Sequence, residues 1–414
     1  MTAIPIRLSV APPPAEWPDE SWRAELERSG AWRPRPFQQF VLKIHGRCNL
    51  ACDYCYVYEM ADQSWRDRPA AMDRALLARA ARRIGEHAEA HGLTTVQVIY
   101  HGGEPLLVGA DYLDYASQTL REAMPAGTTL DLSAQTNGVL LDERMLTVLD
   151  RHDIGLGVSL DGDRVANDRH RRYANGRGSY DLVVQGLQRL SDPAYRRLFR
   201  ILLCTIDLAN DPVETYESLL PFAPPAVDFL LPHGNWDELP PGRNADPGSA
   251  PYGDWLAAIF DRWYGAPRQE TIVRLLQNII DEILLGGSGD DQIGLAPSAL
   301  IEVETDGTLQ QVCTLKSAYD GATCTGLTVA DSFDRALRHP AVAARQAGAA
   351  ALADSCGSCA IRDICGGGYY PHRYRPGTGF RNPTVYCPDM LRLIPHIRRR
   401  LQADLTQLTQ GGVR

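Results

Sequence analysis

The sequence predicts an α/β protein built on a part-closed (β/α)6 barrel of the TIM type, followed by a smaller cysteine-rich domain. Two observations predict the barrel. Six short apolar runs alternate with longer runs of helical periodicity, and turn-forming residues separate them. Such an alternation gives parallel strands that are joined by helices. The third observation is the length of 414 residues, which exceeds what one hydrophobic core usually serves and leaves room for a second domain.

The strands and helices of the barrel are expected in the first half of the chain. The strands are expected at residues 37–45, 95–101, 130–135, 154–160, 199–207 and 227–231. The helices between them are expected at 70–91, 111–124, 141–151, 179–191 and 212–220. A parallel barrel carries its ligand site at the carboxyl ends of its strands, so functional residues are expected in the loops that follow the strands.

Composition divides the chain into four regions. They are an N-terminal extension (1–36), the barrel (37–232), a Gly- and Pro-rich linker with two helices (233–298) and the cysteine-rich domain (299–414). Outside the barrel, helices are expected near 21–28, 252–264, 269–285, 331–352 and 389–409. A β-hairpin is expected at 300–312, because Asp306-Gly307 is a strong turn signal between two apolar runs.

Charge and composition exclude several classes of function. The formal charge is −9, which disfavours binding to nucleic acid. The 44% of apolar and 22% of charged residues are typical of a folded globular protein. No run of about 18 apolar residues predicts a membrane span, and the N-terminus lacks the pattern of a secretion signal. We therefore expect a cytoplasmic protein, in which the ten cysteines do not form a disulfide framework.

Three cysteines, Cys48, Cys52 and Cys55, follow the first expected strand. Their spacing is Cys-x3-Cys-x2-Cys, and three thiolates from one loop can hold a cubane iron–sulfur cluster with one iron left open. Structural zinc takes four ligands, and no fourth Cys or His stands nearby at zinc-finger spacing. The spacing therefore favours a cluster whose open iron is a reaction site.

The run Cys48–Tyr56 resembles the signature of radical S-adenosylmethionine (SAM) enzymes, with Tyr54 at the aromatic position between the last two cysteines. The resemblance implies that the open iron chelates the amino and carboxylate groups of SAM. It also implies that one electron cleaves SAM to a 5′-deoxyadenosyl radical. The cofactor carries this chemistry, and the protein orients it.

Loops after the next strands resemble the other SAM-contacting segments of that family. Gly102–Pro105 is similar to its glycine-rich motif, in which Glu104 offers an acceptor to the SAM ammonium. Residues 135–138 and 159–162 are similar to two further segments. The SAM-binding residues that the resemblance implies are Tyr54, Gly102, Gly103, Glu104, Asn137, Ser159 and Arg171.

Three residues near these loops have competing interpretations. Arg171 resembles an arginine that pairs with a carboxylate, but the adjacent Arg172 leaves a solvated basic face as an even alternative. His101 is interpreted as a packing residue at a strand end. Cys204, inside an apolar run, is expected in the core.

Four cysteines near the C-terminus, Cys356, Cys359, Cys365 and Cys387, offer a closed set of soft ligands. Their spacing leaves zinc possible, but an auxiliary iron–sulfur cluster is favoured because a radical enzyme has use for a redox centre. The pattern resembles the outer auxiliary cluster of SPASM domains, which peptide-modifying radical SAM enzymes carry. It departs from the seven-cysteine version.

At the departure, Tyr369 stands where a cysteine would serve the inner cluster. Cys313 and Cys324 lie where the inner cluster would take its first ligands, and two ligands do not hold a cubane. We expect one complete auxiliary 4Fe-4S cluster. Whether Cys313 and Cys324 help to bind a second one or are buried or free thiols stays open.

The segments 365–374 and 379–387 narrow the resemblance to radical SAM/SPASM peptide-maturing enzymes of the FxsB type, over about residues 37–395. That family implies a three-residue cyclophane, in which an aromatic ring carbon of a ribosomally made precursor peptide is joined to a nearby Cβ. Restoring the ring then requires the loss of one proton and one electron. His372, Tyr374 and Glu302 are candidates for the proton, and the tail cluster is either the electron acceptor or structural.

The expected partners are the precursor peptide and an external electron donor of the flavodoxin or ferredoxin type, with no nucleic acid and no membrane. The hairpin at 300–312 is expected to accept a peptide strand, unless a separate partner delivers the peptide. Other radical SAM modifications are alternatives, namely an ether or thioether crosslink, epimerisation, or formylglycine formation in a sulfatase. A non-catalytic zinc or iron–sulfur protein is a third, less favoured interpretation.

Overall fold

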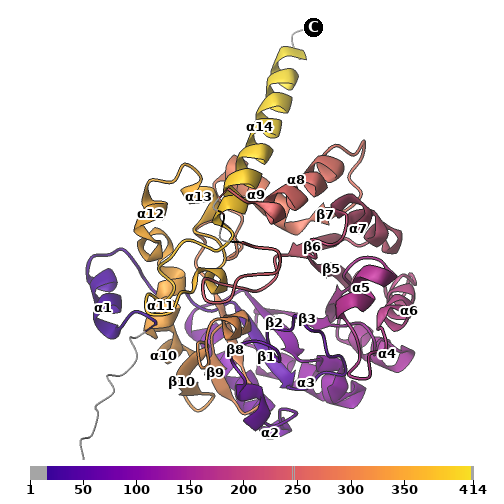
Figure 1. Cartoon of the computed structure of the whole chain (residues 1–414). Helices are drawn as coiled ribbons and strands as arrows, with labels where there is room; N and C mark the ends of the chain where they lie inside the picture. Colours follow the sequence, from indigo (N-terminus) through magenta and orange to yellow (C-terminus); the bar gives the residue numbers. More distant parts are fainter. Residues whose placement is uncertain (1–15, 245, 247, 412–414) are drawn as a thin grey trace, which may run out of the picture.

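The computed structural model describes residues 16–244, 246 and 248–411. They form the expected α/β architecture, with one large sheet and helices around it (Figure 1). The first fifteen residues, where a secretion signal was expected to be absent, lie outside the described residues. In the described part of the chain, no helix is both long and apolar enough to cross a membrane.

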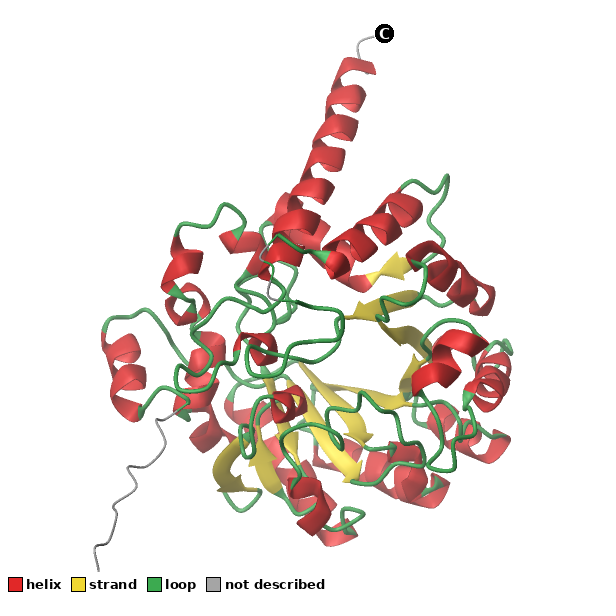
Figure 2. Ribbon diagram, in the orientation of Figure 1, coloured by secondary structure: helices red, strands yellow, loops and turns green. Residues whose placement is uncertain are grey.

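The sheet has ten strands in the order β10-β9-β8-β1-β2-β3-β4-β5-β6-β7. Its centre consists of the six expected strands, each parallel to the next. They are β1 (Gln39–His45), β2 (Thr95–Gly102), β3 (Thr129–Thr136), β4 (Gly155–Ser159), β5 (Phe199–Thr205) and β6 (Ala226–Leu230). The strands form an arc with helices on its outer side (Figure 2), so the predicted part-closed barrel is confirmed.

Helices of the expected length connect these strands. They are α2 (Arg74–Ala90), α3 (Ala110–Ala123), α4 (Glu143–Arg151), α6 (Tyr180–Leu190) and α7 (Pro212–Leu219). Aspartates at residues 73, 142 and 211 cap three of them, because each carboxylate accepts a hydrogen bond from a backbone N–H of the first turn. The apolar faces join the strands in one core, which includes Leu77, Val98, Leu132, Leu202 and the predicted core residue Cys204.

One short helix in the barrel was not expected from the sequence. Helix α5 (Arg164–His170) lies in the segment after β4, and Asp163 caps it through the backbone N–H of Ala166. Seven residues are too few to show a helical period. This helix matters for the site because it ends directly before Arg171.

The segment 269–285, expected as one helix, begins as a strand. Residues Ile272–Val273 form β7, which pairs with β6, and helix α9 runs from Arg274 to Leu285. The β-branched pair favours an extended backbone beside β6, which explains the difference. The preceding helix, α8 (Pro251–Tyr264), has the expected bounds within one residue.

The predicted hairpin is confirmed, with β8 (Leu300–Val303) antiparallel to β9 (Thr308–Gln310). The expectation that it accepts a peptide strand is wrong. Strand β8 pairs in parallel with β1, and β9 pairs with β10 (Cys324–Thr328), so both outer sides of the hairpin are already hydrogen-bonded. Only β10 and β7 are edges of this sheet.

The helix expected at 331–352 is broken into α10 (Phe333–Leu337), α11 (Pro340–Gln346) and the 3₁₀ turn η6 (Gly348–Ala351). Pro340 has no N–H for an α-helical hydrogen bond, and Gly348 has a left-handed φ of +54°, so each interrupts the helix. The cysteine-rich part also contains η5 (Cys313–Ser317), which precedes β10, and α12 (Asp354–Gly357), α13 (Arg362–Cys365) and η7 (Tyr370–Arg373), which follow η6.

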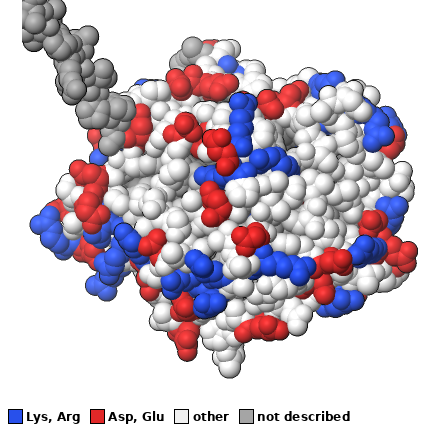
Figure 3. Space-filling model, turned by 90° about the horizontal axis from the view of Figure 1, so that it is seen from below, with Lys and Arg blue, Asp and Glu red and all other residues white. Residues whose placement is uncertain are grey.

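The N-terminal helix of the described chain packs on the cysteine-rich part, and the last helix begins there. Helix α1 (Glu20–Arg28) is capped by Asp19 and packs Leu26 against Ala343 and Ala347. The last helix, α14 (Cys387–Gly411), starts in the cysteine-rich part and projects away from the body (Figure 1). On the face in Figure 3, acidic and basic side chains are interspersed and no continuous basic patch forms.

Candidate functional site

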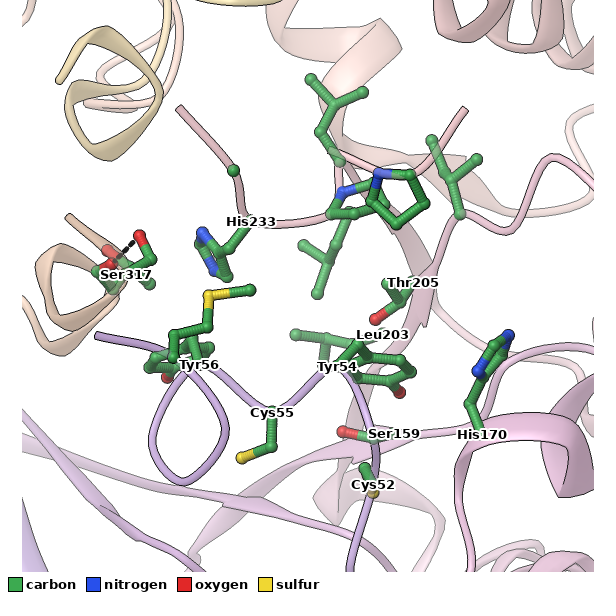
Figure 4. A pocket seen from close by; sticks show the side chains of 18 of the residues that line it. Cys52, Tyr54, Cys55, Tyr56, Ser159, His170, Leu203, Thr205, His233 and Ser317 are labelled. Atoms are coloured by element: carbon green, nitrogen blue, oxygen red, sulfur yellow. Dashed lines mark hydrogen bonds between the residues drawn. The ribbon is translucent and has the colours of Figure 1, made fainter. Parts of the chain in front are cut away.

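A large cavity of about 1050 Å³ opens at the carboxyl ends of the strands. Loops that follow β1, β2, β3, β4, β5 and β6 line one side of it, and residues of the cysteine-rich part line the other. Figure 4 shows labelled side chains of the cysteine loop and of the later loops around this space. The barrel therefore places its ligand site where the sequence predicted it.

The cysteine loop is held on the sheet by close backbone contacts with the glycine motif. Gly103 N–H donates to the carbonyl of His45, and Glu104 N–H donates to the carbonyl of Arg47, at 2.9 and 3.0 Å. A Cβ on Gly103 would lie 1.9 Å from the Tyr58 hydroxyl, so only glycine permits this approach. Gly102 and Gly103 both line the cavity.

The thiols of Cys48, Cys52 and Cys55 all line the cavity and interact electrostatically with one another. Burial raises the pKa of Cys48 to about 12 and that of Cys55 to about 11, and burial also raises the pKa of Cys52. At neutral pH the free thiols are therefore protonated, and metal binding would displace their protons. The Cys48 sulfur also accepts from the Leu50 backbone N–H at 3.4 Å.

Tetrahedral zinc with Zn–S bonds of about 2.3 Å requires ligand sulfurs about 3.8 Å apart. Within the described ranges, no three cysteine sulfurs lie within 4.8 Å of one another, so the thiols are not placed for a single zinc ion. The preference for a cluster rests on the Cys-x3-Cys-x2-Cys spacing.

Next to this loop, Tyr54 and Arg171 form a buried polar group. Arg171 Nη1 donates to the Tyr54 hydroxyl at 2.9 Å, and that hydroxyl donates to Asp161. The Nε of Arg171 is buried without a partner, so one side of a buried cation is free to bind an anion. Arg172 is exposed, whereas Arg171 is buried and lines the cavity, so Arg171 is the one of the two arginines that lies at the candidate site.

Asn137 and Ser159 also line the cavity. The Asn137 amide donates to Asn49 Oδ1 at 2.7 Å and lies 3.7 Å from the Cys48 sulfur, while Gln135 donates to the Ser159 hydroxyl at 3.1 Å. Their contact with SAM stays a proposal. These bonds nonetheless fix both side chains beside the cysteine loop.

Glu104 lies beneath the cavity wall and does not line the cavity. Its carboxylate is fully buried and accepts hydrogen bonds from Leu106 N–H, the Thr136 hydroxyl and Asn137 N–H. Burial still raises the pKa of Glu104 to about 6. Through these three hydrogen bonds Glu104 holds the β2 and β3 loops together.

The four tail cysteines are brought together from α12, α13 and the start of α14. The thiol of Cys387 interacts with Cys356 and Cys359, and that of Cys365 interacts with Cys387 and Cys356. Burial raises the pKa of all three thiols whose shift is resolved, Cys356, Cys365 and Cys387.

Two arginines flank these tail thiols. Arg373 faces Cys356 and Cys365 and donates to the carbonyls of Gly366 and Gly368, while Arg243 faces Cys387. Both guanidinium groups favour the thiolate forms of the cysteines that they face. A cluster with four thiolate ligands is anionic, so buried cations beside it fit such a group.

Cys313 and Cys324 are placed differently from each other. Cys313 is buried, with its sulfur 3.2 Å from the Tyr56 hydroxyl, whereas Cys324 begins the edge strand β10 and is exposed. Tyr369 hydrogen-bonds Thr314, the neighbour of Cys313, at 2.7 Å. The Tyr56 hydroxyl therefore already contacts the Cys313 sulfur, and Cys324 lies apart on an edge strand, which favours the interpretation of these two cysteines as thiols without a cluster.

The wall opposite the cysteine loop is formed by aromatic rings and histidines. His233 lies 4.7 Å from Tyr56 and 5.6 Å from His372, measured between ring centroids, and His372 lies 5.6 Å from Tyr369 and 5.0 Å from Tyr386. All five residues line the cavity. Sequence analysis missed His233, because a lone histidine at the start of a Gly- and Pro-rich segment carries no periodic signal.

Of the three candidates for the proton, His372 alone lines the cavity. Tyr374 lies in a separate apolar cluster, where its hydroxyl is within 3.4 Å of Glu16. Glu302 is buried, accepts from the Cys313 backbone N–H at 2.6 Å and lies 3.4 Å from Lys43. The contacts of Tyr374 and Glu302 are therefore structural.

Comparison with protein families decides the class of the barrel. Residues 42–219 match the radical SAM superfamily. This segment contains the cysteine loop after β1 and the loops that follow β2, β3, β4 and β5, and it ends with α7. The chain contains a radical SAM domain. The family implies SAM and a 4Fe-4S cluster, and the unpartnered Arg171 Nε, the three spaced thiols and the glycine approach fit both.

Two sulfatase-maturating enzymes are among the curated relatives of the radical SAM domain. A serine-type anaerobic enzyme from Klebsiella aerogenes is 32% identical over 38% of this chain and 37% of its own length. Another, from Bacteroides thetaiotaomicron, is 26% identical over 62% of this chain and 63% of its own length. Both alignments span less than two thirds of the relatives.

Two solved structures share the fold beyond the radical SAM domain. Native anSMEcpe with bound AdoMet and Cp18Cys peptide matches with a TM-score of 0.73 and 19% identity, covering 89% of this chain and 99% of that one. SuiB from Streptococcus suis, bound to precursor peptide SuiA, matches with a TM-score of 0.56 and 14% identity, covering 88% and 78%. The C-terminal part thus resembles that of SPASM-containing structures.

Proposed function

We propose that this chain is a radical SAM enzyme that matures a ribosomally made peptide by an intramolecular crosslink between an aromatic ring carbon and a Cβ. The observation that carries the proposal is a cavity lined on one side by the cysteine loop and on another by aromatic residues of the cysteine-rich part. A cavity of about 1050 Å³ has room for SAM and for a short stretch of peptide beside it.

The residues of the chain divide the work between cofactor and substrate. When bound, SAM and its cluster at Cys48, Cys52 and Cys55 supply a radical that removes one hydrogen atom. Arg171 would hold a carboxylate with its free Nε, and Tyr54 keeps that guanidinium in place. The aromatic wall would hold an apolar peptide ring against the reacting carbon, and such positioning is the main contribution of a protein to a radical reaction.

The named structures support a peptide as the substrate class. AdoMet and a peptide are bound together in anSMEcpe, and SuiB is bound to its precursor peptide. The fold shared with both supports a peptide in the same general place here. The electron donor is proposed to be a flavodoxin or ferredoxin, since the chain itself holds no source of the first electron.

A second candidate is formylglycine formation in a sulfatase, which the identity with sulfatase-maturating enzymes favours. The two reactions must be separated by more than mass, because oxidation of a serine and formation of a crosslink both remove two hydrogen atoms. An aldehyde reacts with a hydrazide, and a cyclophane does not.

The test is co-expression with the short peptide encoded beside the gene, with the Cys52→Ala variant as control. A product that lacks two hydrogens, is inert to hydrazide and shows fragmentation interrupted between an aromatic residue and its neighbour supports the proposal. A hydrazide-reactive product from a sulfatase peptide replaces it with the second candidate. Uptake of deuterium from heavy water without formation of a new bond would instead indicate epimerisation.

A further inference from the structure

His233 is a cavity residue that no part of the SAM or cluster site uses. It follows β6 by three residues, and Figure 4 shows its ring over Tyr56, on the side of the cavity that faces Cys55. The Nδ1 of this ring is buried and has no hydrogen-bond partner. A buried imidazole without a partner costs free energy, so the position calls for a function in the cavity.

Several other ionisable groups of the cavity wall have partners or lie near a cation, and the carboxylates of Glu59 and Glu238 line the cavity at exposed positions. Asp228 is ion-paired with Arg274, and His170 bonds both Asp53 and Asp207. Hydrogen bonds or ion pairs therefore already engage these carboxylates and this histidine.

The two remaining histidines of the wall face cations. Burial and Lys43 oppose protonation of His101 while Glu304 favours it, and burial, His233 and Arg373 all oppose protonation of His372. His233 faces Tyr56, Tyr369 and His372 and no charged side chain, and burial alone lowers its pKa, to about 4. The ring is thus neutral at working pH and can accept a proton without repulsion from a fixed cation.

We propose that His233 is the proton acceptor of the crosslinking reaction, an inference that rests on the proposed function. Removal of a hydrogen atom from Cβ leaves a carbon radical, which forms a bond to the aromatic ring. The ring carbon then breaks its C–H bond. The proton goes to the His233 imidazole, and the electron goes to an oxidised iron–sulfur cluster, for which the tail cysteines are the candidate ligands.

The balance of this step agrees with the product. One hydrogen atom leaves with 5′-deoxyadenosine, and one proton and one electron leave from the ring, so the peptide loses two hydrogens in total. A weak base suffices, because an oxidised ring adduct that regains aromaticity is a strong acid. Returning the proton to solvent later resets His233 for the next turnover.

The experiment measures how hydrogen-atom removal and crosslink formation separate in His233→Gln. The substrate is the short peptide encoded beside the gene, synthesised with either protonated or ring-deuterated aromatic residues. The ratio of crosslink to 5′-deoxyadenosine is expected to fall about tenfold or more in the variant. The ring-deuterium isotope effect on that ratio is expected to rise from about one to about two or more, because ring C–H cleavage becomes slow.

Two further variants separate this function from a structural effect. In His233→Ala, added imidazole is expected to restore the crosslink ratio, which a general loss of packing would not allow. His396→Gln is the matched control, since His396 bonds Asp261 on α8, outside the cavity, and is expected to behave as the wild type.

The outcomes distinguish this proposal from the one on which it rests. A wild type that forms no crosslink overturns the proposed function itself. A wild type that crosslinks, with an unchanged ratio and isotope effect in His233→Gln, overturns the assignment to His233 alone. If His372→Gln rather than His233→Gln shows both effects, the proton acceptor is His372.

Discussion

Arg171 Nη1 donates a hydrogen bond to the Tyr54 hydroxyl at 2.9 Å, and this contact joins the segment after α5 to the cysteine loop. The hydroxyl in turn donates to Asp161, so both sides of the contact are fixed. The guanidinium keeps its Nε without a partner. The arginine is therefore held on one side and keeps one N–H donor that no protein group uses, which suits recognition of a carboxylate.

Replacing Arg171 by Gln is expected to weaken SAM binding by about tenfold to a hundredfold, because a buried hydrogen bond to a charged group contributes about 1.5–3 kcal/mol. The measurement is calorimetric titration of SAM into anaerobically reconstituted enzyme. Arg172→Gln is the matched control, since the neighbouring arginine is exposed, and it is expected to bind SAM as the wild type does. Equal affinities of all three proteins would remove Arg171 from the SAM site.

Gly103→Ala is expected to abolish the first cluster while leaving the tail cluster in place. The added Cβ would lie 1.9 Å from the Tyr58 hydroxyl and 2.6 Å from the Arg47 carbonyl carbon, so the cysteine loop must move. Iron content is expected to fall by about half relative to the wild type. Gly287→Ala is the control, because nothing lies within 4 Å of the Cβ it would add. A full iron content in Gly103→Ala would contradict the importance of this approach.

The barrel and the cysteine loop could be predicted because their signals are local. Alternating apolar periods report which residues are buried, and Cys48, Cys52 and Cys55 carry the cluster motif within eight residues. Partners distant in sequence give no such signal. The parallel pairing of β8 with β1 joins residues about 260 positions apart, and only the structure shows that it closes the hairpin to a peptide.

The sequence did not indicate His233 as a site residue for the same reason, because its neighbours are distant in sequence. His233 stands in a segment whose composition predicts a linker, yet the structure places it against Tyr56 and His372, which come from opposite ends of the chain. Nothing in the residues around His233 indicates those neighbours. Conversely, Glu104 belongs to a recognisable motif, but its carboxylate accepts three hydrogen bonds from the protein and does not line the cavity. A sequence motif does not show which groups a side chain will bond.

The contact between His87 and Asp334 predicts how the free energy of unfolding depends on pH. The Nε2 of His87 accepts a hydrogen bond from the Phe37 backbone N–H at 3.1 Å, so Nδ1 carries the proton and donates to Asp334 at 2.8 Å. His91 also lies 2.8 Å from that carboxylate. With Nδ1 protonated, His87 has no lone pair for a metal on that side, although the three residues are close together.

Burial lowers the pKa of His87 below its ordinary value of 6.5. The unfolded chain then binds more protons than the folded one, so the free energy of unfolding is expected to fall as pH falls below about 6.5. Asp334→Ala removes the acceptor of a buried N–H and is expected to destabilise the protein by about 1–3 kcal/mol at pH 7. Urea unfolding at several pH values measures both. Asp331→Ala, at a nearby exposed ion pair with Arg335, is expected to cost less than about 1 kcal/mol.

The tail cysteines are expected to hold a second cubane that is independent of the first. In the wild type, reconstitution without oxygen should give about eight irons per chain, four at each set of cysteines. Replacing Cys48, Cys52 and Cys55 by Ala should leave about four, and replacing Cys356, Cys359, Cys365 and Cys387 by Ala should leave the other four. Cys324→Ser is the control, because that exposed thiol lies on the edge strand.

Iron and zinc analysis with electron paramagnetic resonance distinguishes the alternatives. One zinc and no iron in the variant that lacks the first three cysteines would make the tail a zinc site. About twelve irons in the wild type would mean that Cys313 and Cys324 take part in a third cluster, against the hydroxyl contacts around Cys313. If the tail cluster accepts the electron, its loss must lower crosslink yield per 5′-deoxyadenosine in a folded variant. If it is structural, the remaining folded enzyme keeps that ratio.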